Sequence, residues 1–441
     1  MTRQPVPLSR HAHMSTTGCV LVLVTAFLGW LFAGMQMAVS SLAMRDAVKS
    51  LMLGVSDEGV IGYWFGNLTA AFLLGAAFGG YLFGWVGDVL GRKKAMALSI
   101  LCYSVFSGLT YFVETPLQLF ALRFLTCMGV GGMWPNGIAL VSEAWPNVSR
   151  PFLAGAIGTS ANIGIMLFSA LACFVYITPD QWRWVPLFGM LPGLLGIFVW
   201  VAVPESTRWL ALHQRHADDD PLKAETKHQH KPAGLAEIFQ PPILRITLIG
   251  IMLGTIPLFG GWGSSNWASA WASQVGDKTV EQKADPALKA KVSISRSLPG
   301  SVSSLLGGVF AFWIGRKRFY FIICAAALFC SQYLFRYLEP QDAQFMLWYG
   351  ALGFFSGFFF GWLPLCLPEL FPTRVRATGA GVSFNFGRIV TACGVLFAGG
   401  LLKVWYQGDY GKIGAMTSFI YAIGMIVIFF TPTRNAELLD D

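Results

Sequence analysis

Charged side chains are scarce in this 441-residue chain. Asp, Glu, Lys and Arg make up 12% of it, about half the share that is usual in soluble globular proteins. Hydrophobic residues account for 55%, which is more apolar surface than a soluble domain of this length can bury. The shortage of charge therefore excludes an ordinary soluble protein.

Paired cysteines and catalytic clusters are also lacking. The eight cysteines fall within or beside apolar runs and show no spacing typical of a zinc site or a disulfide framework. We find no nucleophile–base constellation and no phosphate-cradling loop, so we expect no enzyme, no cofactor and no bound metal. The net charge of +8 is spread over loops, which favours lipid headgroups over nucleic acid as its partner.

Long uncharged runs are abundant instead. Segments of about 20 apolar residues are long enough to cross the hydrocarbon core of a bilayer as helices. The sequence predicts an all-α membrane protein with twelve such spans: 18–44, 60–86, 95–113, 118–141, 151–176, 184–203, 244–273, 294–314, 319–337, 344–366, 377–402 and 413–432.

The polar segments divide these spans into two sets of six. We expect a tail at 1–17, a six-helix bundle at 18–203, a central loop at 204–243, a second bundle at 244–432 and a tail at 433–441. The loop carries Asp218–Asp220 and His228–His230, but its mixed charge favours a linker over a metal site. With an even span count both termini share a side, and the excess of Lys and Arg there predicts the cytoplasm. The short loops fit the plasma membrane of a bacterium, its inner membrane.

A glycine-rich basic turn between the second and third spans is repeated in the second half. It reads Gly84-Trp-Val-Gly-Asp88-Val-Leu-Gly91-Arg92-Lys93-Lys94, and its partial echo runs from Gly308 to Arg318. A motif that returns at half the length of an apolar chain indicates two related halves, as in many transporters.

Further motifs follow in order at other span ends: Arg123–Gly132, Glu143–Pro146 with Arg150, Pro204–Leu210 and Pro368–Gly379. Together with the basic turns they resemble the major facilitator superfamily over nearly the whole chain. In particular they resemble its sugar-porter and organic-ion branches, including the sialate and lactate symporters and the synaptic-vesicle-protein relatives. The resemblance implies two pseudo-symmetric bundles of six helices that rock about a central site.

In the resembled family these turns form a gate on the cytoplasmic side. Asp88 is expected at the positive N-terminal end of span eleven, and Arg92 beside acids at neighbouring span ends. Glu143 with Arg150, and Glu369 with Arg374 or Arg376, are the other expected pairs. The alternative is that these residues are only topology-setting charges at helix ends.

Acids and histidines are missing from the interior of every expected span, which argues against a dedicated proton relay. Arg388 lies about mid-membrane in span eleven without an evident buried acid, and a bound organic anion would offset its charge. The alternative is a structural arginine bonded to backbone carbonyls. Arg123, near the outer end of span four, is expected to be structural and to hold span one.

Polar and aromatic residues on other spans complete the expected substrate site: Gln36, Asn162, Asn266, Trp267 and Asn385. For each amide the alternative is a contact between helices, and for the tryptophan a place at the membrane interface.

The sequence thus predicts a monomeric secondary transporter for a small organic anion, with or without a co-transported ion. It leaves open a neutral sugar or polyol porter, and also a receptor or sensor that transports nothing.

Overall fold

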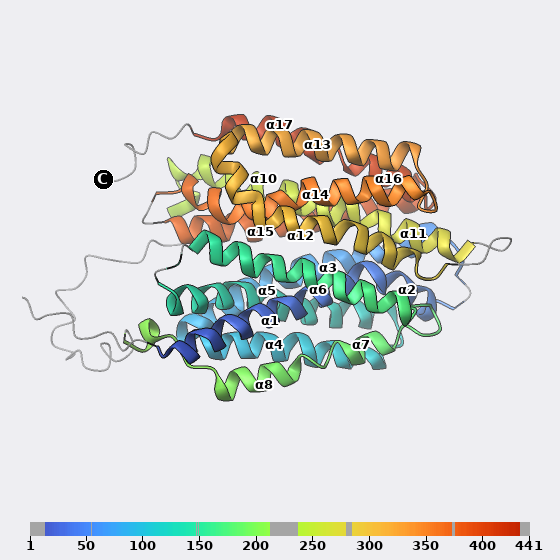
Figure 1. Ribbon diagram of the computed structural model, residues 1–441. Coiled ribbons are helices and arrows are strands. Elements are labelled where there is room, and N and C mark those ends of the chain that lie inside the picture. The colour runs from blue at the N-terminus through green and yellow to red at the C-terminus, as the bar shows by residue number, and fades with distance from the viewer. Residues whose placement is uncertain are drawn as a thin grey trace, which may run out of the picture.

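The computed structural model describes residues 14–53, 55–146, 148, 150–211, 237–278, 285–372 and 375–432. These residues form helices joined by short turns, and no strand occurs among them (Figure 1). Arg374 and the acidic and histidine-bearing part of the central loop lie outside the described residues.

Twelve helical segments of the described chain are long and apolar enough to cross a membrane, which confirms the predicted fold class. The helices of residues 14–211, the first half, are α1 Thr16–Leu42, α2 Met44–Leu51, α3 Glu58–Leu90, α4 Arg92–Leu109, α5 Pro116–Ala144, α6 Arg150–Phe174, α7 Trp184–Phe188 and α8 Gly193–Ala202. Those of residues 237–432, the second half, are α10 Ile243–Leu258, α11 Asn266–Lys278, α12 Leu288–Ile314, α13 Arg316–Tyr337, α14 Ala343–Cys366, α15 Arg376–Val404, α16 Tyr410–Thr417 and α17 Ile420–Val427.

The helices begin and end where local chemistry dictates. The Ser15 hydroxyl accepts a hydrogen bond from the Gly18 amide at the start of α1, and Thr115 with Gln118 forms a capping box at the start of α5. Gly91 and Gly315 separate α3 from α4 and α12 from α13 with φ values of 107° and 92°. Only glycine adopts this conformation without strain, which explains why the glycine recurs in both basic turns.

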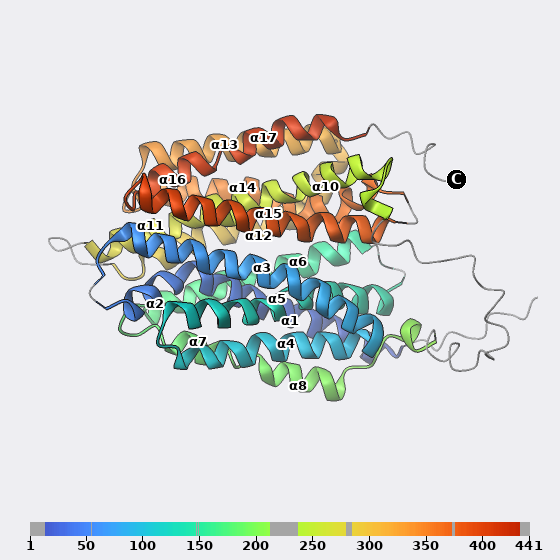
Figure 2. The ribbon, with the colours of Figure 1, turned by 180° about the vertical axis from the view of Figure 1, so that it is seen from behind.

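Both termini of the described chain lie at one end of the helices (Figures 1 and 2). We call this end the terminal face, and the opposite end, which carries α2 and α7, the distal face. The two halves lie side by side, and they meet mainly where α3 packs against α15 and where α6 packs against α12. Sites between these helices therefore draw residues from both halves of the sequence.

Three details of the helices bear on the site. The seventh span is interrupted by a π-helical segment, Phe259–Ser265, in which three of the seven residues are glycine. The eighth span begins at Leu288, six residues before its expected start, so that more polar residues lie within α12. A short extra helix, α2, follows the first span and is buried over most of its length.

Candidate functional site

A small cavity lies between the two halves, nearer the distal than the terminal ends of α1 and α12. Its volume is about 40 Å³, which is enough for one or two water molecules. Pockets that hold small organic ligands are roughly ten times larger. The polar residues that line it are Ser41, Asn162, Asn266, Ser269, Ser293, Arg296, Ser297, Tyr349 and Ser356.

Arg296 is the one charged residue that lines this cavity in the described part of the chain. Its guanidinium carbon lies 5.9 Å from the centre of the Tyr349 ring, and the Tyr349 hydroxyl donates to the Ser265 carbonyl at 2.8 Å. The Arg296 Nε is buried and has no hydrogen-bond partner among the described residues. None of the carboxylates described forms an ion pair with it.

This arrangement has an electrostatic consequence. A cation at membrane depth costs about 2.5–3.5 kcal/mol on insertion scales when nothing offsets it. A carboxylate is the natural partner because the guanidinium fork binds its two oxygens at once. The cavity therefore offers an anion a charge, an open donor and neighbouring amide and hydroxyl groups.

Close helix packing holds Arg296 in place. A Cβ atom added at Gly353 of α14 would lie 2.3 Å from the Arg296 carbonyl oxygen, and one at Gly357 would lie 2.6 Å from the Gly300 carbonyl oxygen. Only glycine lets the two backbones approach this closely. Helices α12 and α14 are thus packed as a unit, and one wall of the cavity is rigid.

Two of the predicted substrate residues, Asn162 and Asn266, line this cavity. Asn266 also contacts the other half, because its side-chain amide lies 3.4 Å from the Thr69 hydroxyl. Gln36 and Trp267 are directed elsewhere: Gln36 donates to the Gly189 carbonyl at 2.9 Å, and the Trp267 indole donates to the Gly263 carbonyl at 2.8 Å. The Gln36 bond is that of the helix-packing alternative, whereas Trp267 is 1% exposed and bonds within its own span. Substrate binding by either residue stays a prediction.

Arg388 and Asn385 lie at the interface of α3 and α15 and are not among the residues that line the cavity. The Arg388 Nη1 donates to the Ala76 carbonyl at 3.1 Å and to the Asn385 side-chain oxygen at 3.2 Å. Its guanidinium also lies 4.8 Å from the centre of the Phe384 ring. Arg388 therefore has the contacts expected of a structural arginine that is bonded to a backbone carbonyl. Substrate binding by this residue stays a prediction.

Arg123 was expected to hold the first span, and it does. Its guanidinium donates to the Gln36 carbonyl and to the Ser40 hydroxyl, both on α1. These contacts give Arg123 a packing role, although its Nε has no hydrogen-bond partner among the described residues.

The charged motifs of the terminal face form several described contacts. Asp88 pairs with Arg92 at 2.5 Å, four residues away, across the α3–α4 turn. Glu143 accepts a hydrogen bond from the Ser206 hydroxyl, and Glu369 pairs with Arg316 at 2.6 Å. Each of these contacts stays within one half.

The remaining gating residues give less information. Arg376 donates to the Phe371 carbonyl at 3.4 Å, and the side chain of Arg150 is not described. A gating role for the whole set remains a prediction, because the described contacts do not join the two halves at this face.

Sequence reasoning missed Arg296 as a site residue. The expected eighth span, 294–314, includes it near its outer end, where a cation is typical of the membrane surface. The signal was the run Ser293-Ile-Ser-Arg-Ser297, in which small polar residues surround a cation inside an apolar segment. Helix α12 begins at Leu288, which places Arg296 two turns inside the span.

No cluster of three or more His, Cys, Asp or Glu residues that could hold a metal ion occurs in the described ranges. The cavity side chains contain amides, hydroxyls and a guanidinium, and these recognise an organic ligand better than a cation.

Comparison with known proteins agrees with this architecture. The Major Facilitator Superfamily profile matches residues 22–395. The niacin transporter NiaP of Acinetobacter baylyi is 25% identical and covers 94% of each chain, and the cis,cis-muconate transport protein of the same species is 25% identical over 88% of this chain and 89% of its own.

The fold has a solved counterpart. An inward-open structure of the xylose transporter XylE from E. coli superposes with a TM-score of 0.68 at 19% identity, and the match covers 95% of this chain and 97% of the other. At this identity the likeness is one of fold alone. The chain belongs to the Major Facilitator Superfamily and is a multi-pass membrane transporter rather than an enzyme.

Proposed function

We propose that the protein carries a small organic anion, a carboxylate, across the membrane by alternating access between its two halves. The observation that carries this proposal is Arg296, a half-buried guanidinium that lines the cavity between the halves and pairs with no described carboxylate. A substrate that brings its own negative charge removes the electrostatic penalty of this residue.

The neighbours of Arg296 suit the rest of such a substrate. Asn162 faces the cavity from the first half and Asn266 from the second, so a bound molecule would contact both halves at once. The Trp262 and Tyr349 rings supply apolar surface beside the polar groups. This mixture of rings and polar groups is typical of sites for small organic ligands.

The size of the cavity supports movement of the halves. At about 40 Å³ it is too small for an organic acid, so binding requires that the walls separate. Helices α12 and α14 are packed through glycines and move together, so the enlargement occurs between halves.

The substrates named for two relatives favour an anion over a sugar. Niacin and muconate, the substrates named for the two Acinetobacter relatives, are both carboxylic acids. The xylose transporter shares the fold at low identity and gives no information on the substrate. A neutral sugar would leave the charge of Arg296 uncompensated.

The orientation and the gate are part of the proposal. We expect a bacterial inner-membrane location with both termini in the cytoplasm, because the basic clusters Arg92–Lys94 and Arg316–Arg318 lie on the terminal face. Asp88, Arg92, Glu143, Glu369 and the arginines near it would close that face when the carrier opens on the other side. A co-transported ion is compatible with this scheme.

The test is uptake of radiolabelled nicotinate and cis,cis-muconate into proteoliposomes that contain the purified protein. Arg296→Gln removes the charge and keeps much of the side-chain volume. A hydrogen-bonded charge contributes about 1.5–3 kcal/mol, so we expect uptake at low substrate concentration to fall roughly 10- to 100-fold.

Arg336→Gln is the matched control, because Arg336 is exposed on the distal face outside the cavity and bonds only to Gln332 in the described chain. It should transport like the parent. The proposal fails if Arg296→Gln also transports like the parent, or if xylose competes fully with the labelled acids. Loss of uptake in a folded Arg388→Gln variant alone would assign the anion to Arg388 instead.

A further inference from the structure

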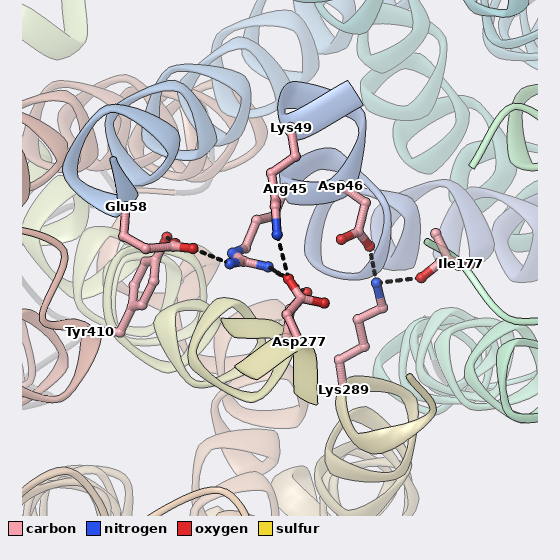
Figure 3. Close-up of polar contacts among 9 residues, drawn as sticks. Arg45, Asp46, Lys49, Glu58, Ile177, Asp277, Lys289 and Tyr410 are labelled. Atoms are coloured by element: carbon pink, nitrogen blue, oxygen red, sulfur yellow. Dashed lines mark hydrogen bonds and ion pairs between the residues drawn. The ribbon is translucent and has the colours of Figure 1, made fainter. Parts of the chain in front are cut away.

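Charged groups are buried between the two halves at the distal face (Figure 3). Arg45 and Asp46 of α2 are each 1% exposed, and Lys289 of α12 is 4% exposed. Sequence reasoning placed all three in loops outside the expected spans. Burial of three ionised side chains is costly unless each has a partner, so the contacts that surround them carry information.

Arg45 makes the first bridge between the halves. Its guanidinium pairs with Glu58 at 2.5 Å within the first half and with Asp277 of α11 at 2.8 Å in the second half. It also donates to the Ser273 hydroxyl at 3.0 Å, and the Tyr410 hydroxyl lies 3.4 Å from the Glu58 carboxylate. One guanidinium thus joins α2 and α3 to α11.

Lys289 makes the second bridge. Its ammonium group pairs with the Asp46 carboxylate and donates to the Ile177 carbonyl at 2.8 Å, both in the first half. Lys49 pairs with Asp277 at 2.7 Å and completes the cluster (Figure 3). The cluster contains three cations and three carboxylates, so its formal charges balance.

The terminal face differs. The ion pairs there, Asp88 with Arg92 and Arg316 with Glu369, each lie within one half in the described chain. In this conformation the described ion pairs that join the halves therefore lie at the distal face.

The second bridge is also connected to the cavity. Lys289 and Arg296 are seven residues apart on α12, which places them on one face of the helix about two turns, or roughly 10 Å, from each other. Because both residues lie on one continuous helix, a movement of Arg296 displaces Lys289 as well.

We propose that Asp46 and Lys289 form a latch that holds the distal face closed, with Arg45 as a parallel bridge, and that α12 couples this latch to the substrate site at Arg296. The role of the latch in transport rests on the proposed carrier function, but the latch itself is expected in the protein without substrate. Opening the distal face separates both pairs and exposes their charges to water.

The energetics suit a latch that opens repeatedly. A buried ion pair adds little net stability, because the cost of desolvation nearly cancels the attraction of the charges. Removal of one partner is far worse, since it leaves a buried charge without compensation. The pair therefore specifies the closed arrangement without trapping the carrier in it.

The test is hydrogen–deuterium exchange of the full-length protein in nanodiscs without substrate, followed in peptides that cover Met44–Leu51 and the start of α12. Lys289→Met leaves Asp46 buried alone, and we expect the equilibrium to shift about a hundredfold or more toward the open distal face, with faster exchange in both peptides. In the double variant Asp46→Asn/Lys289→Met no charge remains buried, so exchange should return toward the parent.

Lys291→Met is the matched control, since Lys291 lies on the same helix but pairs with Asp285 of its own half at 2.6 Å. A Lys289→Met variant that exchanges like Lys291→Met overturns the latch, as does a double variant as open as the single one. If Lys289→Met does not fold, Asp277→Asn tests the other bridge at a half-exposed residue, and unchanged exchange there also contradicts the proposal.

These measurements involve no ligand. If the protein transports no anion, the exchange experiment can still be interpreted. If the latch proposal is contradicted, the uptake experiment can still be interpreted.

Discussion

Three arginines lie inside membrane-spanning helices, away from the helix ends, and their partners distinguish their roles. Arg123 bonds to oxygens of α1, and Arg388 bonds to the Ala76 carbonyl. Arg296 alone of the three lines the cavity between the halves, and its guanidinium forms no hydrogen bond or ion pair to a described residue. A guanidinium held by backbone oxygens needs no ligand, whereas one without such bonds beside a cavity attracts an anion.

Asp46 gives the distal face a pH dependence. Burial raises the pKa of its carboxyl above the ordinary value, although Lys289 and Arg45 act in the opposite direction. The charged or titratable groups around it are Arg45 and Lys49 on its own helix, Glu58 of α3, Asp277 of α11, Lys289 of α12 and Tyr410 of α16.

The sign of the effect follows from this raised pKa. Because desolvation outweighs the attraction of Lys289 and Arg45, the closed face holds the ionised latch at a net cost and binds the Asp46 proton more tightly than an open face, where the carboxyl meets water. Stabilisation of the closed face by this proton is therefore fully present below the ordinary carboxyl pKa and is lost as the pH rises through the raised value. We expect deuterium exchange in Met44–Leu51 to become faster as the pH rises above the ordinary carboxyl range, measured relative to the double variant Asp46→Asn/Lys289→Met at each pH.

Comparison with Asp46→Asn/Lys289→Met at the same pH removes the intrinsic pH dependence of exchange. A constant ratio between parent and variant over this range would show that Asp46 does not titrate with the movement.

Helix α12 is the element that connects the two sites. It carries Lys289 at its distal end and Arg296 two turns further along, and glycines of α14 fix its position. The π-helical segment Phe259–Ser265 lies across the cavity on the seventh span, where Trp262 and the following Asn266 face the same space. One wall of the cavity is therefore the continuous helix α12, and the opposite wall contains a π-helical interruption.

Gly353→Val tests the importance of this packing. The new side chain would meet the Arg296 carbonyl oxygen, so α12 and α14 must separate. Overpacking of this kind costs about 1–3 kcal/mol. We expect a lower thermal unfolding midpoint together with weaker uptake of labelled nicotinate, as measured in detergent and in proteoliposomes respectively.

Gly381→Val is the control, because a Cβ atom at Gly381 on α15 meets nothing within 4 Å. Equal effects of the two valine variants would mean that helix propensity, not the α12–α14 contact, causes the loss.

At the scale of the whole molecule, the two faces differ in how the halves are joined. Buried ion pairs cross between halves at the distal face, while the described pairs of the terminal face remain within a half. Hydrogen bonds at the α3–α15 and α6–α12 interfaces, such as Ser169 to Ser293 at 2.8 Å, lie between these faces. This asymmetry is what a carrier closed on one side requires.

The direction of the whole molecule in the membrane is open to a simple test. The basic turns on the terminal face predict cytoplasmic termini. We expect a C-terminal green fluorescent protein fusion to fluoresce in a bacterial host and a C-terminal alkaline phosphatase fusion to be inactive. The same two reporters inserted after Tyr337, at the distal face, should behave in the opposite way, and a reversed pattern contradicts the orientation.

The sequence by itself determined the class of this protein. Twelve apolar runs have one stable form in a bilayer, because each must satisfy its own backbone hydrogen bonds, and the glycines of the repeated turns mark related halves. It also indicated Asn162 and Asn266, which line the cavity.

The tertiary structure alone decided which charges matter. Whether an arginine meets a carbonyl or a cavity depends on neighbouring helices that are distant in the sequence, so Arg388 and Arg296 could not be ranked by position in a span. The burial of Arg45, Asp46 and Lys289 likewise follows from the closure of one half against the other. In the sequence each is only a charged residue beside a span, and an ion-pair partner of each lies in the other half.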